Sequence, residues 1–467
     1  MIIIKRILSI ALAGCLWFTI IGTALALNDK TPVTEVPAAG SSIDIAAVQK
    51  QLDAAENIVP GDPKATESAS RLLRYLYAVA RTDDVLFGRQ RDTDAKATEY
   101  AGSSNSDTRD MVGVIPAVVG ADAGEGLIQN PAVSAAISLA AAREGAIITL
   151  SAHMGDFSVM NTLNDDNGYQ GSQSKVKDMT KYILPGGEKN GVFTAYLDKI
   201  AEYAALLDER DIPLLFRPYH EHTGNWFWWA KGWLSEEDYI TLWRYTVDYL
   251  RDTKNIHNIL YEFSPDSPNS AAEYMYGYPG DEYVDVFGLD FYDSQWHGPT
   301  FEDFLGRLKT QLGVALKLAG EHRKPFALTE TGIQNNADWD TRPDTWFADV
   351  SNLLKPFGVS YFMVWASWSK TQYMIPYKTS DTAGHPYVDG FIKFYNDPHS
   401  VFADGAEFYG DKLNYSPGAS PSAEPSVEPG ASPAESPLAK AWPWIVIGIV
   451  IIGGVAAILR RRKNKGE

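Results

Sequence analysis

Cysteine is almost absent from this chain of 467 residues, because Cys15 is the only one. It lies in an apolar N-terminal segment, so the sequence predicts neither a disulfide framework nor a thiolate metal site in the folded region. Positive charge is also scarce: 41 lysines and arginines stand against 59 acidic residues, which gives a net charge of −18. Binding to a phosphate backbone needs a basic surface, so this deficit argues against a nucleic-acid partner.

The sequence also lacks a glycine-rich phosphate turn after its first expected strand, which a doubly wound open sheet would usually carry. Residues 67–413 instead alternate short apolar runs with helical patterns. Eight such units predict an α/β fold of the (β/α)8 TIM-barrel type, with the open sheet as the alternative. The expected strands are Val85–Gly88, Ile115–Val119, Ile147–Leu150, Leu214–Phe216, Ile259–Tyr261, Val286–Leu289, Phe326–Leu328 and Tyr361–Trp365, and helices are expected for example at 194–210, 236–252 and 300–319.

The two ends of the chain predict export and a membrane tether. A lysine and an arginine precede an apolar stretch that ends at Ala24-Leu25-Ala26, as in a signal peptide. Leu12-Ala13-Gly14-Cys15 offers a competing lipoprotein processing site. An uncharged apolar run near the C-terminus is long enough to span a bilayer, and Arg460–Lys463 after it predicts a cytoplasmic tail. We therefore expect a monomeric protein at the cell surface, composed of a signal peptide (1–26), an N-terminal leader (27–66), the barrel (67–413), a Pro/Ser/Ala-rich linker (414–440), a transmembrane helix (441–459) and a basic tail (460–467).

One stretch in the middle of the chain combines an apolar run, a polar cluster and a set of aromatics. The run Leu214–Phe216 predicts a buried strand, Glu221 follows shortly after it, and four aromatics occupy Trp226–Trp229. Aromatic rings beside a carboxyl group shield it from water, which raises its pKa and keeps it protonated. We interpret Glu221 as a general acid in a carbohydrate site. The alternative is a surface acid beside a tryptophan-rich core.

Polar and aromatic residues recur where the expected strands end, which is where barrels of this type gather their active residues. These residues are His153, Glu221, Glu262, Asp290 with Tyr292, Glu330 and Trp365. A retaining glycosidase needs two carboxylates about 5–5.5 Å apart, one as proton donor and one as nucleophile. The fourth and seventh strands face each other across a barrel, so Glu221 and Glu330 are predicted to share a cleft, with Glu330 as nucleophile. Glu262 and Asp290 are rival acids, which we interpret as supporting or ion-pair groups.

The stretch from Arg217 to Trp229 resembles the acid/base signature of glycoside hydrolase family 26. That family consists mainly of endo-β-1,4-mannanases with retaining (β/α)8 barrels. The resemblance extends in order over roughly residues 84–400. The weaker matching segments are Phe87–Gln90, Pro116–Asp122, Thr149–Met154, Gly288–Tyr292, Leu328–Glu330, and Trp365 with Tyr373–Tyr377.

The resemblance implies the catalytic residues and the class of substrate. Glu221 would be the acid/base and Glu330 the nucleophile, and Tyr292 would hydrogen-bond Glu330 and orient it. The substrate would be a β-linked, mannan-type polysaccharide. No metal and no cofactor are expected.

It also implies residues that bind the sugar. His153 and His220 would line the site around the reacting ring. Trp226 and Trp365 would form platforms on either side of the scissile bond.

The chain departs from the family's pattern at positions that shape sugar subsites. Arg89 replaces the usual histidine, Ala152 the usual tryptophan, and His222-Thr223 the usual Met-Asn, while Gly155-Asp156-Phe157 replaces Asp-Asn-Pro. Lichenase and β-1,3-xylanase activities, which the family also contains, therefore remain alternatives.

Two other classes of function are open on the residues alone. A non-catalytic surface lectin would also use an aromatic cleft on a stalk, but it has no need for two facing acids. His220 and His222 flank an acid, which suggests a metallohydrolase, yet a catalytic zinc site needs three protein ligands and the sequence shows no further histidine cluster.

Overall fold

The described part of the chain runs from residue 29 to residue 415, with short gaps, in this computed structural model. It comprises residues 29–165, 168–169, 171, 174, 176–334 and 336–415. The expected signal peptide, the linker from residue 416 on, the transmembrane helix and the basic tail lie outside these residues. Within the described part, no helix combines the length and apolarity needed to cross a bilayer.

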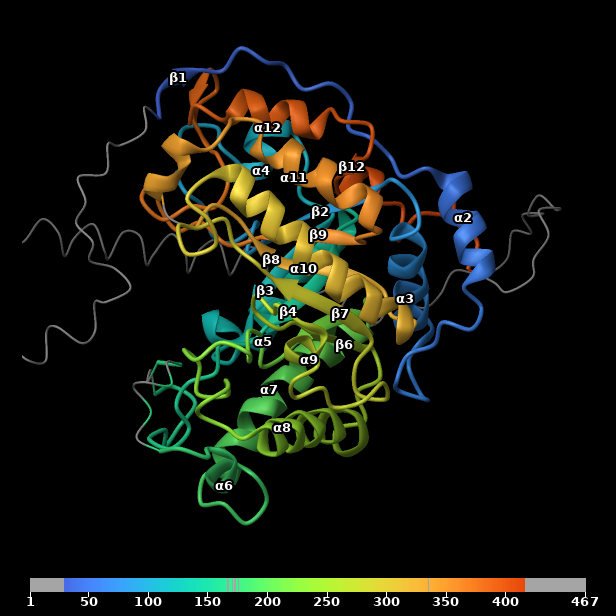
Figure 1. Cartoon of the computed structure of the whole chain (residues 1–467), viewed down its shortest axis with the longest axis vertical. Coiled ribbons are helices and arrows are strands. Elements are labelled where there is room, and N and C mark those ends of the chain that lie inside the picture. The colour runs from blue at the N-terminus through green and yellow to red at the C-terminus, as the bar shows by residue number, and fades with distance from the viewer. Residues whose placement is uncertain are drawn as a thin grey trace, which may run out of the picture. The chain divides into compact units, whose positions relative to one another are not determined.

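Eight parallel strands form a closed barrel, which confirms the predicted (β/α)8 fold (Figure 1). The strands pair in chain order, and the first, β2, also pairs with the last, β9, with Arg89 opposite Val364. All eight expected strands are present, but β3 begins three residues later than expected, because Pro116 lacks the amide hydrogen that a central strand needs. The strands are β2 Val85–Gln90, β3 Val118–Asp122, β4 Ile147–Ser151, β5 Leu214–Arg217, β6 Ile259–Phe263, β7 Val286–Asp290, β8 Phe326–Thr331 and β9 Tyr361–Val364.

Helices surround the barrel, and the three named from the sequence are present with slightly shifted ends. The longest, α10, begins at a capping box in which Thr300 and Asp303 exchange side-chain and backbone hydrogen bonds. The helices are α2 Ile45–Ala54, α3 Glu67–Val79, α4 Asp107–Val112, α5 Pro131–Arg143, α6 Thr180–Ile183, α7 Asn190–Asp208, α8 Glu236–Asp248, α9 Ala271–Tyr274, α10 Phe301–Glu321, α11 Trp346–Leu354 and α12 Val388–Tyr395.

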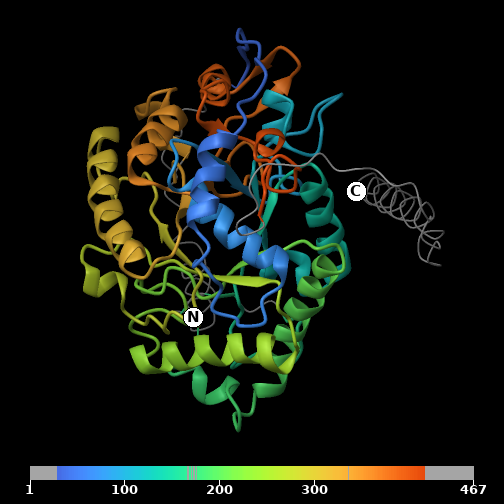
Figure 2. The same ribbon diagram turned by 90° about the vertical axis from the view of Figure 1, so that its right-hand side faces the viewer.

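Helices α2 and α3 close the amino-terminal end of the barrel. Leu72 and Leu76 of α3 join one buried apolar cluster with Leu215 and Leu260, which lie on inward-facing strand positions. Ser360, just before β9, donates a hydrogen bond to the carbonyl of Leu76 at 3.0 Å. Figure 2 shows these blue helices on the side turned to the viewer. A site is therefore expected at the other end of the barrel, where the strands have their carboxyl ends.

The segment expected as a leader is part of the folded unit. It contains the helix α2, whose Val48 and Leu52 are buried. Its strand β1 (Thr31–Pro32) pairs with β11 (Ala383–Gly384), which pairs with β10 (Lys378–Ser380). A further short strand, β12 (Ser400–Val401), pairs with β2 outside the barrel ring. These contacts tie residues from both ends of the described region to the barrel.

Candidate active site

Two carboxylates from opposite strands meet at the carboxyl end of the barrel. One side-chain oxygen from each of Glu221, Asp290 and Glu330 lies within 4.8 Å of the other two. Glu221 follows β5 and Glu330 belongs to β8, the fourth and seventh strands of the ring. The separation suits a reaction in which one carboxyl group donates a proton while the other attacks the same sugar directly.

Glu330 accepts hydrogen bonds on both of its oxygens. The Tyr292 hydroxyl donates to Oε2 at 2.6 Å, and Nη2 of Arg217 donates to Oε1. Nη1 of the same guanidinium donates to Oδ2 of Asp290 at 2.7 Å. All four side chains are buried, so charge-assisted bonds of this kind act in a medium of low polarity. They fix the orientation of Glu330.

Glu221 is held in a different environment. Burial raises its pKa well above the ordinary value, and the nearby charges of Glu330 and Asp266 raise it further. The indole N–H of Trp226 donates to its Oε2 at 2.6 Å, and this bond lowers the pKa. The side chain is still partly exposed, so it can reach a bound substrate. Glu221 is thus prepared to hold its proton and act as an acid.

The backbone that carries Glu221 has an uncommon conformation. Tyr219 and Glu221 have φ angles of 51° and 55°, in the left-handed region that side chains other than glycine rarely adopt. The N–H of Glu221 donates to the carbonyl of Ser264 at 2.8 Å, and Gly224 donates to the carbonyl of Glu221 at 3.0 Å. The Tyr219 ring is fully buried. These contacts hold a turn that aims Glu221 across the barrel.

The rings of two histidines, His153 and His220, meet in a T-shaped arrangement beside the carboxylates. Nε2 of His153 is 3.3 Å from Nε2 of His220, a distance at which one of these nitrogens donates a hydrogen bond to the other. Burial opposes charge on His153, but the contact from its Nδ1 to Asp122 at 2.7 Å outweighs burial and raises its pKa. Burial lowers the pKa of His220 well below its ordinary value, and Arg217 adds to this. His153 can therefore carry the proton and donate it to a neutral His220.

The His-Glu-His triplet does not form a metal site. His222 turns away from His220, donates from Nε2 to the carbonyl of Tyr276 at 2.7 Å, and stacks on Tyr239. Burial lowers its pKa to about 4. Over the part of the chain that the structure describes, the one cluster with metal-ligand spacing is the trio of acids named above, which includes no histidine. Arg217 already supplies positive charge to two of those acids.

The aromatics divide into a site group and a packing group. Trp226 contacts Glu221, and the Trp365 ring lies 5.4 Å from the His153 ring. Trp228 and Trp229 are buried and donate their indole hydrogens to backbone carbonyls, as expected for core residues. All seven residues named from the sequence for catalysis or sugar binding therefore lie in one connected group.

The family model described as Glycosyl hydrolase family 26 matches residues 61–371. The chain belongs to glycosyl hydrolase family 26. This agrees with the resemblance found in the sequence, and it makes the protein a glycoside hydrolase by family.

Relatives in family 26 include proteins named for mannan hydrolysis. A mannan endo-1,4-beta-mannosidase of Bifidobacterium adolescentis is 34% identical over 312 residues, which cover 61% of this chain and 30% of that protein. A protein of the same name from Bacillus subtilis is 26% identical over 61% of this chain and 77% of its own length. The solved catalytic domain of the Bacillus sp. JAMB-750 GH26 endo-beta-1,4-mannanase is 31% identical, with a TM-score of 0.66 over 76% of this chain and 96% of that one. The aligned part thus spans under a third of the Bifidobacterium relative.

Two residues of this family 26 site had no role in the sequence interpretation. Arg217 ends β5, two residues after Leu215, whose side chain faces into the barrel. Alternate residues of a strand point the same way, so Arg217 also points into the barrel, where a buried arginine requires an acidic partner. Asp122 ends β3 and pairs with His153. The rival acid Glu262 lies deeper and accepts from Tyr361 and Thr149, which fits a supporting group.

Proposed function

We propose that this protein is an extracellular endo-glycosidase that hydrolyses β-1,4-mannosidic linkages in mannan and glucomannan with retention of configuration. The observation that carries the proposal is the close approach of Glu221 and Glu330 at the mouth of the barrel. The printed names of the family 26 relatives support mannan as the backbone. The apolar segments at 1–26 and 441–459 support export and a membrane tether.

The proposed reaction assigns a separate task to each carboxyl group. Glu221 donates its proton to the glycosidic oxygen while Glu330 attacks the anomeric carbon, so the leaving chain departs as an alcohol and a glycosyl ester remains. Glu221, now ionised, then takes a proton from water, whose oxygen attacks the same carbon and releases Glu330. Two inversions give net retention. Tyr292 and Arg217 orient the nucleophile.

The remaining site residues act on the sugar. His153 and His220 line the site beside Glu330, since Nε2 of His220 is 3.9 Å from its Oε1. Trp226 and Trp365 offer flat apolar faces for sugar rings on either side of the scissile bond. None of these steps requires a metal ion or an organic cofactor.

The test is a reducing-sugar assay of the full-length protein on mannan, glucomannan, lichenan and β-1,3-xylan. Release from the first two supports the proposal. Release of reducing sugar only from lichenan or β-1,3-xylan would indicate a different substrate that is also known in family 26. Binding to a polysaccharide without release of reducing sugar would favour a lectin. Activity that a chelator removes would contradict the metal-free mechanism.

Changing Trp226 to phenylalanine should shift the basic limb of the pH profile of kcat/KM to higher pH. Glu221 must be protonated to act first, so activity falls as pH rises through its pKa. The indole N–H stabilises the charged form and holds that pKa down, so its removal raises the pKa. Trp233→Phe is the matched control, because it loses an indole bond to the carbonyl of Asn225 in the same loop. A downward shift, or an equal shift in the control, would contradict the assignment.

Changing Tyr292 to phenylalanine should lower kcat about 10- to 100-fold, because a hydrogen bond to a charged group contributes about 1.5–3 kcal/mol. The variant loses the donor to Oε2 of Glu330 and keeps the ring. Steady-state kinetics on mannan measure this. Tyr278→Phe removes a similar hydroxyl bond, to Asp281 at 2.6 Å, away from the site, and should leave kcat unchanged. Equal rates in the two variants would remove Tyr292 from the mechanism.

A further inference from the structure

An open groove of about 500 Å³ lies beside the candidate site on the carboxyl-end rim of the barrel. One wall is the loop after β2, and the other is the loop after β9. These two strands are neighbours in the barrel, where Arg89 pairs with Val364. The groove therefore opens at the same end of the barrel as the carboxylates.

The groove adjoins the centre of the site through the β9 loop. Trp365 directly follows β9 and contacts the His153 ring. Trp368, in the groove wall, is three residues further on, and three residues of chain reach at most about 11 Å. A chain molecule bound over Trp365 can thus extend into the groove.

The lining combines one exposed aromatic face with many small polar groups. Trp368 is 45% exposed, although large rings are normally buried. The polar groups opposite it are hydroxyl, carboxylate and carboxamide side chains. The members that matter here are Thr93, Asp94, Thr98, Glu99, Asn105 and Trp368.

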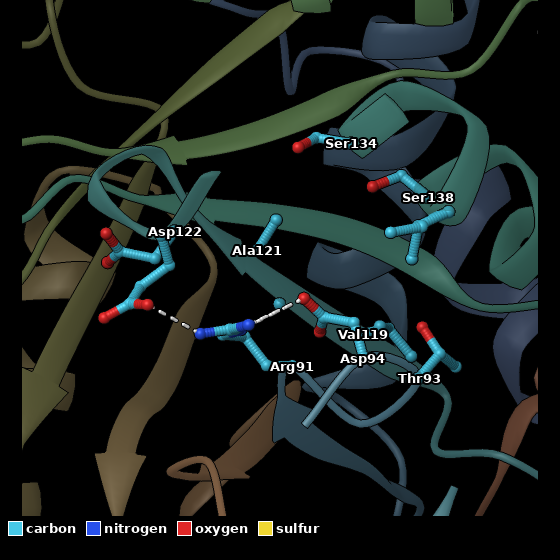
Figure 3. A pocket seen from close by; sticks show the side chains of 11 residues that line it. Arg91, Thr93, Asp94, Val119, Ala121, Asp122, Ser134 and Ser138 are labelled. Atoms are coloured by element: carbon cyan, nitrogen blue, oxygen red, sulfur yellow. Dashed lines mark hydrogen bonds and ion pairs between the residues drawn. The ribbon is translucent and has the colours of Figure 1, made fainter. Parts of the chain in front are cut away.

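Internal contacts hold the wall formed by the loop after β2 in place. Arg91 donates to Asp94, as Figure 3 shows, and also pairs with Glu125 at 2.9 Å. A cavity of about 20 Å³ behind this loop has room for about one water molecule. Lys96 donates to the Ser104 carbonyl at 2.7 Å and to a neighbouring acid. A wall that is ordered before binding loses little entropy when a ligand arrives.

The charges of the groove select against an acidic ligand. Its lysine, Lys96, already pairs with Asp110 at 2.6 Å. Arg91 is likewise paired with both Asp94 and Glu125, and Glu99 adds negative charge to the lining, so a uronic acid or a sulfated sugar would meet repulsion. A neutral pyranose fits both features, because its C–H face can lie on Trp368 while its hydroxyls donate to the carboxylates.

We propose that this groove is a sugar-binding subsite for the part of an uncharged β-linked hexose chain that lies beyond the reacting ring. Trp368 is its stacking platform, and the loop after β2 supplies acceptors for hydroxyls. The inference rests on the proposed function and adds to it a reason for preferring long chains. It assigns Trp368 to binding and leaves the bond-breaking step to the carboxylates.

The test compares kcat/KM of the full-length protein for mannotriose and mannohexaose. Trp368→Ala should lower kcat/KM for mannohexaose about tenfold, since it removes the apolar face on which a sugar ring stacks. For mannotriose the change should stay within about twofold, because the groove lies beyond the sugars that it occupies. Trp368→Phe should recover most of the loss. Trp296→Ala is the matched control, because Trp296 is 81% exposed on the loop after β7 and does not line this groove.

The other outcomes separate this inference from the function it rests on. Equal losses on both substrates, or none on either, would overturn the subsite while leaving the mannanase proposal intact. A tenfold loss on mannohexaose in Trp296→Ala as well would show a general surface effect and would also overturn it. Failure of the unchanged protein to cleave mannohexaose would overturn the proposed function and the subsite with it.

Discussion

Replacing Glu330 with alanine should lower kcat on mannan by about 10⁴-fold or more, the range found when a covalent nucleophile is removed. The variant has no group to form the glycosyl ester, and water cannot reach the anomeric carbon in the same orientation. Binding of oligosaccharide should persist, because the sugar platforms are unchanged. Reducing-sugar release measures the loss, and circular dichroism confirms that the barrel remains folded.

Restoring activity to the Glu330→Ala variant with an added nucleophile tests the assignment more sharply than loss of activity does, because the configuration of the product can be determined. Azide added to Glu330→Ala, with an activated aryl glycoside, should occupy the space left by the carboxylate and give a glycosyl azide of inverted configuration. Glu262→Gln is the matched control, since Glu262 is a buried acid of β6 that bonds Tyr361 and Thr149. It should retain most activity. An active Glu330→Ala, or an inactive but folded Glu262→Gln, would shift the nucleophile assignment.

Replacing Glu221 with alanine should lower kcat/KM on mannan by about 10²- to 10⁴-fold, the usual contribution of general acid catalysis. The loss should depend on the leaving group. A sugar alcohol needs the proton that Glu221 donates, whereas a dinitrophenolate does not. On a dinitrophenyl glycoside the first step should therefore stay fast, and the glycosyl ester should accumulate as a burst.

Two further measurements on the Glu221→Ala variant test its role. The basic limb of the pH profile should disappear, because the raised pKa of this residue is its origin. Azide should attack the accumulated ester and give a product of retained configuration, opposite to that from the Glu330 variant. Loss of activity that is equal for all leaving groups would contradict the acid/base role.

The sequence was sufficient for the barrel because each strand is a short apolar run followed by polar residues. Parallel strands end on one rim, so residues far apart in the chain were expected to meet there. Glu221 and Glu330 do meet, although 109 positions separate them, and their chemical roles remain predictions. The start of β3 was wrong because Pro116 interrupts the pairing that the apolar run suggested.

Contacts that depend on side-chain direction were not predictable in the same way. The Arg217 guanidinium bridges Asp290 and Glu330 from two other strands, and no local pattern fixes such a bridge. The left-handed φ angles of Tyr219 and Glu221 contradict local preference and exist because the surrounding packing imposes them. Both features occur at the candidate site, where local and global preferences often conflict.

The double contact of Arg217 has a consequence for the whole catalytic cycle. In the proposed mechanism Glu330 becomes an ester, and its negative charge disappears from the barrel until water releases it. A buried guanidinium left alone at that stage would be strongly destabilising. Asp290, which never reacts, stays bonded to Arg217 at 2.7 Å and keeps it neutralised. Arg217 therefore keeps an acidic partner both before and after the glycosyl ester forms. The covalent intermediate does not leave a buried cation unpaired.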